Sequence, residues 1–179
     1  MGILLRLSGG IDRLSAQLGR LAAWLVLVAA LLSAGNAASR YLFDASSNAW
    51  LEIQWYLFGG MVLLGGAHTL RRNEHVRVDI LYNALPPRGR LWIDIGGLVL
   101  FLLPFTLAMA WLSWPVAWRS LATMEGSSSA GGLLRWPVKM LLPLGFGLLA
   151  LQGLSELVKR VAALRGLLAL ETAYEKPQQ

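Results

Sequence analysis

Four long stretches of uncharged, mainly apolar residues constrain the fold of this chain more than any other feature. A helix needs about 20 apolar residues to cross the hydrocarbon core of a membrane. The four stretches have about this length, and we expect transmembrane helices over residues 21–39, 50–70, 95–118 and 137–155. The second contains Glu52 near its beginning. The fourth contains Lys139, whose long side chain can reach the interface. The sequence therefore predicts an all-α polytopic membrane protein with four transmembrane helices.

The composition excludes several other classes of protein. Charged residues make up only 15% of the 179 residues, against about 25% in a typical soluble domain. The absence of cysteine excludes disulfides, thiolate metal sites and thiol redox chemistry. The net charge of +6 does not indicate nucleic-acid binding, because the basic residues flank the apolar stretches and form no separate basic stripe. Membrane lipids with anionic headgroups are the expected partners of these residues.

Amphipathic segments flank the spans. Apolar residues recur at three- and four-residue spacing over residues 3–19, which predicts an interfacial helix leading into the first span. A second interfacial helix is expected over residues 74–85, where Pro86 and Pro87 then end it. Beyond the fourth span, helical periodicity continues around Lys159 and Arg160.

The remaining segments complete a single domain. Residues 126–132 consist of Gly, Ser and Ala and predict a flexible loop. We expect residues 1–170 to form one four-helix transmembrane domain and residues 171–179 to form a disordered tail.

The distribution of Lys and Arg predicts the orientation in the membrane. Loops on the cytoplasmic side of a membrane carry an excess of these residues. The N-terminal segment, the second connection and the C-terminal segment hold twelve of the sixteen Lys and Arg residues, and the first and third connections hold four. Both termini are therefore expected in the cytoplasm, and the protein in the bacterial inner membrane.

Tryptophan residues cluster near the expected ends of the spans. Such residues commonly anchor helices at the two membrane–water interfaces. The expected interfacial aromatic anchors are Trp50, Trp55, Trp92, Trp114, Trp118 and Trp136.

We expect no charged side chain of this protein near the middle of the membrane. Transporters place substrate sites near mid-depth, but the span centres near Leu31, Gly60, Thr106 and Gly147 have no charged neighbour. The sequence contains no phosphate loop, metal-ligand cluster or paired nucleophile and base. We therefore expect no catalytic, cofactor or metal site, no enzyme activity, and no transport by this chain alone.

Polar residues near the span ends are candidates for subunit-interface or structural contacts. Glu52 is open to three interpretations: a carboxylate that faces water, a contact to a partner or to Arg40, and a ligand of a coupling ion. The densely charged run 71–79 is either a solvated flank or a structured element that fixes the spans or docks a partner. The full set of candidates is Glu52, Gln54, Arg71, Arg72, His75, Arg77, Asp79, Arg135 and Lys139.

Several stretches resemble one family of transport proteins. They read LEIQWYL at 51–57, TLRRNEHVRVDI at 69–80, GGLLRWPVK at 131–139 and LPLGF at 142–146. These stretches resemble the small membrane subunit of tripartite ATP-independent periplasmic (TRAP) transporters, in the branch for mannitol, chloroaromatic and related organic-acid uptake. Two positions depart from that pattern. Leu51 stands where many relatives have a second acid beside Glu52, and Leu134 stands where the related branch has proline.

The resemblance implies a division of labour between subunits. It implies a large polytopic subunit that carries substrate and sodium as an elevator, and a periplasmic substrate-binding protein that delivers the substrate. The small subunit would brace and anchor the stationary scaffold of the large one. An alternative from the residues is a haem- or quinone-anchoring subunit of a respiratory complex. His68 and His75 lie on one helix face, about 10.5 Å apart along the axis, and cannot ligate opposite sides of one haem.

Overall fold

The named elements in the described part of the chain are all helical. The computed structural model describes residues 2–74, 82 and 85–168. In these residues there is no strand, only one isolated β-bridge between Gly126 and Leu134. The elements are α1 (Gly2–Phe43), α2 (Asn48–Arg72), α4 (Pro87–Gly97), the π-helical turn η1 (Leu98–Leu102), α5 (Leu103–Ala122) and α6 (Trp136–Leu164). The predicted all-α class is confirmed, and all four predicted apolar stretches are helical.

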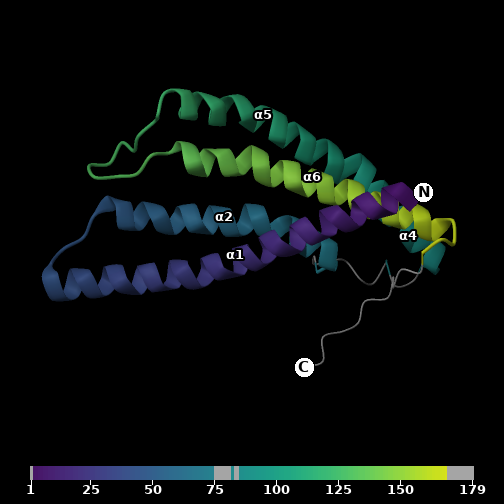
Figure 1. Ribbon diagram of the computed structural model, residues 1–179, viewed down its shortest axis with the longest axis horizontal. Helices are drawn as coiled ribbons and strands as arrows, with labels where there is room; N and C mark the ends of the chain where they lie inside the picture. The colour runs from purple at the N-terminus through teal and green to yellow at the C-terminus, as the bar shows by residue number, and fades with distance from the viewer. Residues whose placement is uncertain (1, 75–81, 83–84, 169–179) are drawn as a thin grey trace.

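The long helices lie side by side in an elongated bundle (Figure 1). Helix α6 lies between α5 and α2, and α1 borders α2 on the other side. The connections 44–47 and 123–135 lie together at one end of the bundle, which we call the connection end. The N-terminus, α4 and the last turns of α6 lie at the opposite end, which we call the N-terminal end.

Three helical stretches are long and apolar enough to cross a membrane. They are Gly2–Phe43, Pro87–Ala122 and Trp136–Leu164. Helix α2 has 25 residues and contains the second expected span, 50–70, but it is less apolar because Gln54, His68 and four glycines interrupt its hydrophobic residues. Three spans therefore follow from length and composition.

Helix α1 is one continuous element of 42 residues. The expected interfacial helix 3–19 and the expected span 21–39 are not separated in it, because the sequence between them has no proline or turn signal to stop the helix. At 1.5 Å per residue the helix is about 63 Å long, twice the thickness of a hydrocarbon core. It crosses α2 and reaches α6 with its N-terminal half (Figure 1).

The third apolar stretch contains a local widening of the helix. Pro87 begins α4 at a position where the missing N–H is not needed. The π-helical turn η1 directly precedes Pro104, which has no N–H to bond to the turn before it, and the N–H of Leu103 bonds to the carbonyl of Leu98. The chain thus continues as one helical rod to Ala122.

Close approach between helices depends on two glycines of α6. A Cβ at Gly145 would lie 2.7 Å from the Cβ of Leu63 on α2. A Cβ at Gly153 would lie 2.6 Å from a methyl carbon of Leu102. Small residues at such positions let membrane helices pack backbone to side chain. Helix α6 therefore contacts α2 and the η1–α5 rod on two of its faces.

The structure leaves some expectations outside the described residues. Most of the expected interfacial helix 74–85 and the whole tail 171–179 belong to the parts that are not described. Helix α6 continues past the expected end of its span at residue 155 and ends at Leu164.

Candidate functional site

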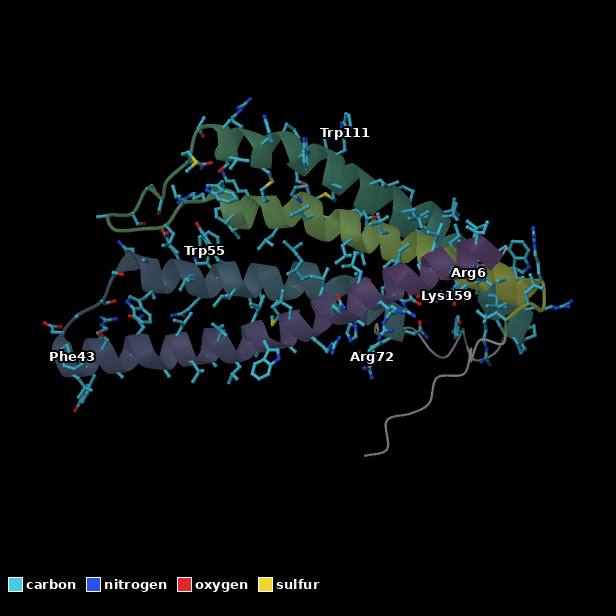
Figure 2. The ribbon with its side chains drawn as sticks, viewed as in Figure 1. Arg6, Phe43, Trp55, Arg72, Trp111 and Lys159 are labelled. Carbon is cyan, nitrogen blue, oxygen red and sulfur yellow. The ribbon has the colours of Figure 1, made fainter. Side chains whose placement is uncertain are left out.

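Polar and charged side chains from three helices gather at the N-terminal end of the bundle, where Figure 2 shows Lys159 close to α1. Several of them are almost completely buried. We call this group the α1–α6 polar cluster, and its members are Ser8, Asp12 and Ser15 of α1, Asp94 of α4, and Gln152, Ser155, Glu156, Lys159 and Arg160 of α6.

Gln152 is the centre of the cluster and has no exposed surface. Its side-chain oxygen accepts a hydrogen bond from Ser15 Oγ at 2.7 Å. Its nitrogen donates to Asp12 Oδ1 at 2.8 Å and to Glu156 Oε1 at 3.0 Å. The amide of one α6 residue therefore holds two side chains of α1 and one of its own helix.

Ion pairs extend the cluster to α4. Lys159 Nζ lies 3.1 Å from Asp12 Oδ2, and Arg160 Nε lies 3.0 Å from Asp94 Oδ2. Glu156 pairs with both Lys159 and Arg160. Three carboxylates thus face two cations, and the group has a formal charge of −1. Because each charge has an opposite partner in a largely buried place, removal of one partner would leave another uncompensated.

The sequence signal for this cluster exists but is weak. Asp12 looks like the solvated face of an interfacial helix, and Lys159 and Arg160 look like the polar face of an amphipathic extension. Gln152, Ser155, Glu156 and Lys159 do recur at helical spacing and mark one polar face of α6. The sequence of one helix cannot say that this face meets α1 rather than water.

A second polar group fixes the connection between α5 and α6. The Glu52 carboxylate is buried, with 7% of the residue exposed. It accepts hydrogen bonds from Ser127 Oγ and, at 2.7 Å, from the backbone N–H of Leu133. Among the described residues Glu52 forms no ion pair with Arg40, and it does not face water. Both partners lie in the connection 123–135, which we call the loop and which includes the residues 126–132 that were expected to be flexible.

Two neighbours of Glu52 on the same face of α2 contact this loop as well. Asn48 donates to the carbonyl of Ala130 at 2.9 Å, and Tyr56 donates to the carbonyl of Leu134 at 2.9 Å. Residues four apart on a helix share one face. One stripe of α2 therefore holds the loop at three points, and we call this group the α2–loop contact.

The loop also has internal contacts near its two ends. The N–H of Arg135 donates to the carbonyl of Glu125 at 2.8 Å. Lys139 Nζ lies 2.5 Å from the Glu125 carboxylate, and its hydrogen bond holds the pKa of Glu125 below the usual value. The Arg135 side chain donates to Ser128 Oγ at 3.3 Å. Glu52, Arg135 and Lys139 are thus brought together by the loop.

The other candidate polar residues lie elsewhere. Gln54 lines a surface cavity of about 530 Å³ near the connection end, together with Arg40 and Asp44. Arg72 pairs with Glu74 at 2.8 Å on the surface, and Arg71 Nε is buried without a hydrogen-bond partner among the described residues. His75, Arg77 and Asp79 lie outside the described part of the chain.

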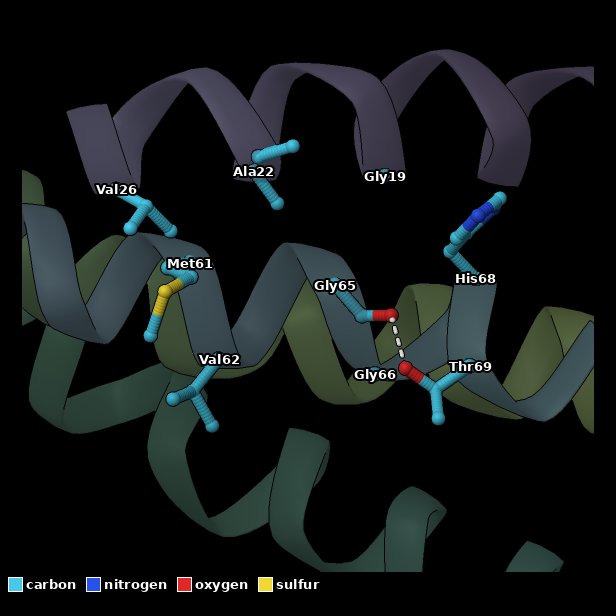
Figure 3. A pocket seen from close by; sticks show the side chains of 10 residues that line it. Gly19, Ala22, Val26, Met61, Val62, Gly65, Gly66, His68 and Thr69 are labelled. Atoms are coloured by element: carbon cyan, nitrogen blue, oxygen red, sulfur yellow. Dashed lines mark hydrogen bonds between the residues drawn. The ribbon is translucent and has the colours of Figure 1, made fainter. Parts of the chain in front are cut away.

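A groove of about 430 Å³ lies between α1 and α2 (Figure 3). Its walls are mostly small and apolar, and they include Gly19, Ala22, Gly65 and Gly66. The His68 side chain points toward α1 and packs on Gly19, where a Cβ would overlap with the imidazole. The Thr69 hydroxyl donates a hydrogen bond to the carbonyl of Gly65 at 3.2 Å. The groove thus reflects close helix packing.

Most of the expected aromatic anchors are exposed. Trp114 and Trp118 stack with ring centres 6.5 Å apart, and both lie in the half of α5 that reaches the connection end. Trp92 is on α4, at the opposite end of the bundle. Trp111 is 80% exposed farther from the end of α5 and was not among the expected anchors. The exposed fractions of the others are 38% for Trp50, 47% for Trp55, 64% for Trp92, 51% for Trp114 and 56% for Trp118, whereas Trp136 is half-buried.

Comparison with known proteins extends the resemblance seen in the sequence. Residues 29–163 match the family model described as tripartite ATP-independent periplasmic transporters, DctQ component. A C4-dicarboxylate TRAP transporter small permease protein DctQ of Vibrio cholerae is 38% identical over 60 residues, which cover 34% of this chain and 26% of that protein. A putative TRAP transporter small permease protein of Haemophilus influenzae is 38% identical over 55 residues, or 31% of this chain and 34% of that protein.

The two aligned stretches thus span about a quarter and a third of these relatives, whereas the family match spans most of this chain. Its apolar helices agree with the inner-membrane location of this family. The chain belongs to the DctQ family, the small membrane permease subunits of TRAP transporters.

Proposed function

We propose that this chain is a non-catalytic subunit that crosses the membrane four times and braces the scaffold of a large elevator-type permease subunit. The assembled transporter would take up an organic acid or a similar solute with sodium, and a periplasmic substrate-binding protein would deliver it. Membership of the DctQ family supports the role as a small permease subunit. The large subunit, the sodium coupling and the class of solute are what the family resemblance implies.

One observation carries the bracing role: the buried polar contacts are gathered toward the two ends of the bundle. The α1–α6 polar cluster joins three helices at the N-terminal end, and the α2–loop contact joins α2 to the α5–α6 connection at the connection end. Between them, the hydroxyl of Thr106 bonds to the carbonyl of Leu102 at 2.8 Å and offers nothing to a solute. Such a bundle suits a stationary frame, because its helices are fixed at both ends.

The proposed orientation places the connection end in the periplasm. The connections 44–47 and 123–135 lie together there, and the segments that join the spans on that side contain only four of the sixteen Lys and Arg residues. The N-terminus and the end of α6 would then lie in the cytoplasm, in agreement with the excess of positive charge on that side. Helix α2, with 25 residues, is long enough to be the fourth span.

We further propose that residues 1–170 act as one domain, and that the exposed tryptophans anchor it at both interfaces. The candidate polar residues would then have structural or subunit-interface roles. Glu52, Arg135 and Lys139 would shape the periplasmic surface, and Arg71 and Arg72 would lie on the cytoplasmic side. None of these five would contact the solute.

Co-purification tests this proposal directly. The tagged chain is expressed together with a TRAP large-permease gene and a binding-protein gene of the same genome. We expect a much larger polytopic subunit to co-purify in a fixed ratio. Vesicles with the small chain alone should show no solute flux above that of empty vesicles. Purification of the small chain without a larger membrane subunit, or solute flux through it alone, would contradict the proposal.

A further inference from the structure

A surface cavity of about 510 Å³ lies where α5 ends and α6 begins. Pro115 and Val116 supply an apolar part of its wall. The polar part comes from Arg119, Ser120, Glu125 and Lys139. The cavity combines apolar and charged walls, and none of its residues belongs to the α1–α6 polar cluster or to the α2–loop contact. Glu125 lies in the α5–α6 connection, and Lys139 lies in the first turn of α6.

The cavity has a net positive charge. Glu125 and Lys139 pair with each other and cancel. Arg119 is exposed, and no carboxylate among residues 2–74, 82 and 85–168 lies within ion-pair distance of its guanidinium. The remaining charge of +1 complements the single negative charge of a phosphodiester. A guanidinium also binds phosphate oxygens with two parallel hydrogen bonds.

A buried hydroxyl in the wall lacks a partner. Ser120 is 1% exposed, and its Oγ has no hydrogen bond in the described part of the chain. Other hydroxyls of α5 are satisfied by carbonyls one turn earlier: Ser113 donates to Met109 at 2.6 Å and Thr123 donates to Arg119 at 2.9 Å. The Ser120 hydroxyl is near the Glu125 carboxylate and contributes to lowering its pKa. The two groups do not have the geometry of a hydrogen bond. A ligand oxygen would remove the cost of this unpaired hydroxyl.

The surrounding tryptophans indicate the depth of the cavity. Trp114 and Trp118 are exposed and stacked on the turns that lead to Arg119. Exposed tryptophans of membrane helices commonly lie at the level of the lipid headgroups. The cavity should therefore meet lipid phosphates, whichever side of the membrane this end faces.

We propose that this cavity binds the phosphate of a glycerophospholipid that has one net negative charge. Arg119 donates hydrogen bonds to the phosphate oxygens, and the Ser120 hydroxyl donates one more. The glycerol backbone and the first acyl carbons lie over Pro115 and Val116. A lipid bound in this way holds the α5–α6 connection at the membrane surface, which goes beyond the proposed bracing of a partner subunit.

Native mass spectrometry of the delipidated full chain in detergent tests the site. The chain is titrated with phosphatidylglycerol and, separately, with phosphatidylethanolamine of the same acyl chains. We expect one phosphatidylglycerol to bind at least several-fold more tightly than phosphatidylethanolamine. Arg119→Gln should weaken phosphatidylglycerol binding about tenfold, the effect of one charge-assisted hydrogen bond. Ser120→Ala should weaken it about threefold without a change of charge.

The matched control is Arg40→Gln, which removes an exposed cation near the same end of the bundle but outside this cavity. This control should change phosphatidylglycerol binding less than twofold, and circular dichroism should give all variants the helix content of the parent. Equal losses in Arg119→Gln and Arg40→Gln would overturn the site, as would equal binding of the two lipids. Displacement of phosphatidylglycerol by millimolar inorganic phosphate would overturn the lipid assignment in favour of a free-phosphate site.

Discussion

The side-chain amide of Gln152 makes three hydrogen bonds that an apolar side chain could not make. It is fully buried and bonds to Ser15, Asp12 and Glu156. In Gln152→Ala, Asp12 and Glu156 keep their ion pairs with Lys159, whereas the fully buried Ser15 hydroxyl loses its hydrogen bond. Unpaired buried polar groups cost about 1–3 kcal/mol each in typical cases. We expect Gln152→Ala to lower the free energy of unfolding by about that amount, measured by denaturation in mixed micelles with circular dichroism.

The matched variant is Gln17→Ala, which removes the same amide from an exposed position of α1. We expect its free energy of unfolding to stay within about 0.5 kcal/mol of the parent, as for most surface substitutions. A similar loss in both variants would mean that the buried contacts of Gln152 do not stabilise the fold.

Glu125 gives the loop a dependence on pH. Its pKa lies below the usual value near 4.5, first because Lys139 donates a hydrogen bond to the carboxylate. A carboxyl group whose pKa is lowered by folding stabilises the folded state above its unfolded pKa, and this stabilisation is lost as the pH falls through the folded value. We expect the unfolding midpoint of the parent to exceed that of Glu125→Gln near pH 7. The difference should shrink below about pH 4.5.

A midpoint difference that stays constant from pH 7 to pH 3 would contradict this role of Glu125. Glu74→Gln is the comparison, because Glu74 pairs with Arg72 on an exposed surface and such pairs contribute little.

The sequence alone identified Glu52 as a candidate for a structural contact, but it did not identify the partners of Glu52. A lone carboxylate at the end of an apolar stretch is visible in any single sequence. Its carboxylate accepts hydrogen bonds from Ser127 and Leu133, which lie 75 and 81 positions farther along the chain. No periodicity connects such distant positions. The same reason explains why Asp12 and Gln152, 140 positions apart, could not be paired in advance.

Among the helices, α1 departs most from what its sequence suggests. Its first half looks like a separate interfacial helix, yet Ser8 and Ser15 are buried against α6. Because the chain has no cysteine, an engineered pair can test this contact. Ser8 Oγ and Ser155 Oγ lie 2.5 Å apart. We expect Ser8→Cys with Ser155→Cys to form a disulfide efficiently in oxidised membranes, seen as a mobility shift on non-reducing gels.

The control pair is Ser8→Cys with Ser113→Cys, which places the second thiol on α5. This pair should remain unlinked under the same conditions. Failure of the first pair, or equal linkage in both, would favour a first half of α1 that lies on the membrane surface away from α6.

The helices were predictable because a long uncharged stretch of residues is expected to cross the lipid as a helix. Residues 21–39, 95–118 and 137–155 fall inside long helices, as expected. The continuity of α1 was not predictable, since an Arg and a Gly between two apolar segments allow either a break or a helix. The π-helical turn before Pro104 also needed the structure, because a proline can be accommodated by a kink or by a widened turn.

For the whole molecule, the positions of the connections imply a defined orientation. Ser128 lies in the connection between α5 and α6, and Gly2 is the first residue of α1. In the proposed arrangement, a cysteine in Ser128→Cys should react with an impermeant maleimide added outside intact spheroplasts. A cysteine in Gly2→Cys should react only after the membrane is permeabilised. Labelling of both from the outside, or of neither, would contradict an even number of spans with cytoplasmic termini.

The distribution of polar contacts over the whole bundle supports the proposed role as a frame. Polar contacts hold the bundle toward both ends, and the middle of the spans offers no charged group to a solute. In the proposed role as a frame, this chain positions the large subunit, and another subunit selects the solute. Substitutions at Glu52 or Arg72 should therefore reduce assembly of the transporter and leave its substrate preference unchanged.

Solute uptake by the reconstituted transporter tests whether this chain braces the large permease subunit. Vesicles contain the large permease subunit with or without this chain, and the binding protein, the candidate solute and a sodium gradient are supplied outside. We expect sodium-dependent uptake of the solute only when this chain is present, with no uptake by this chain alone. Undiminished uptake by vesicles that lack this chain would contradict the bracing role.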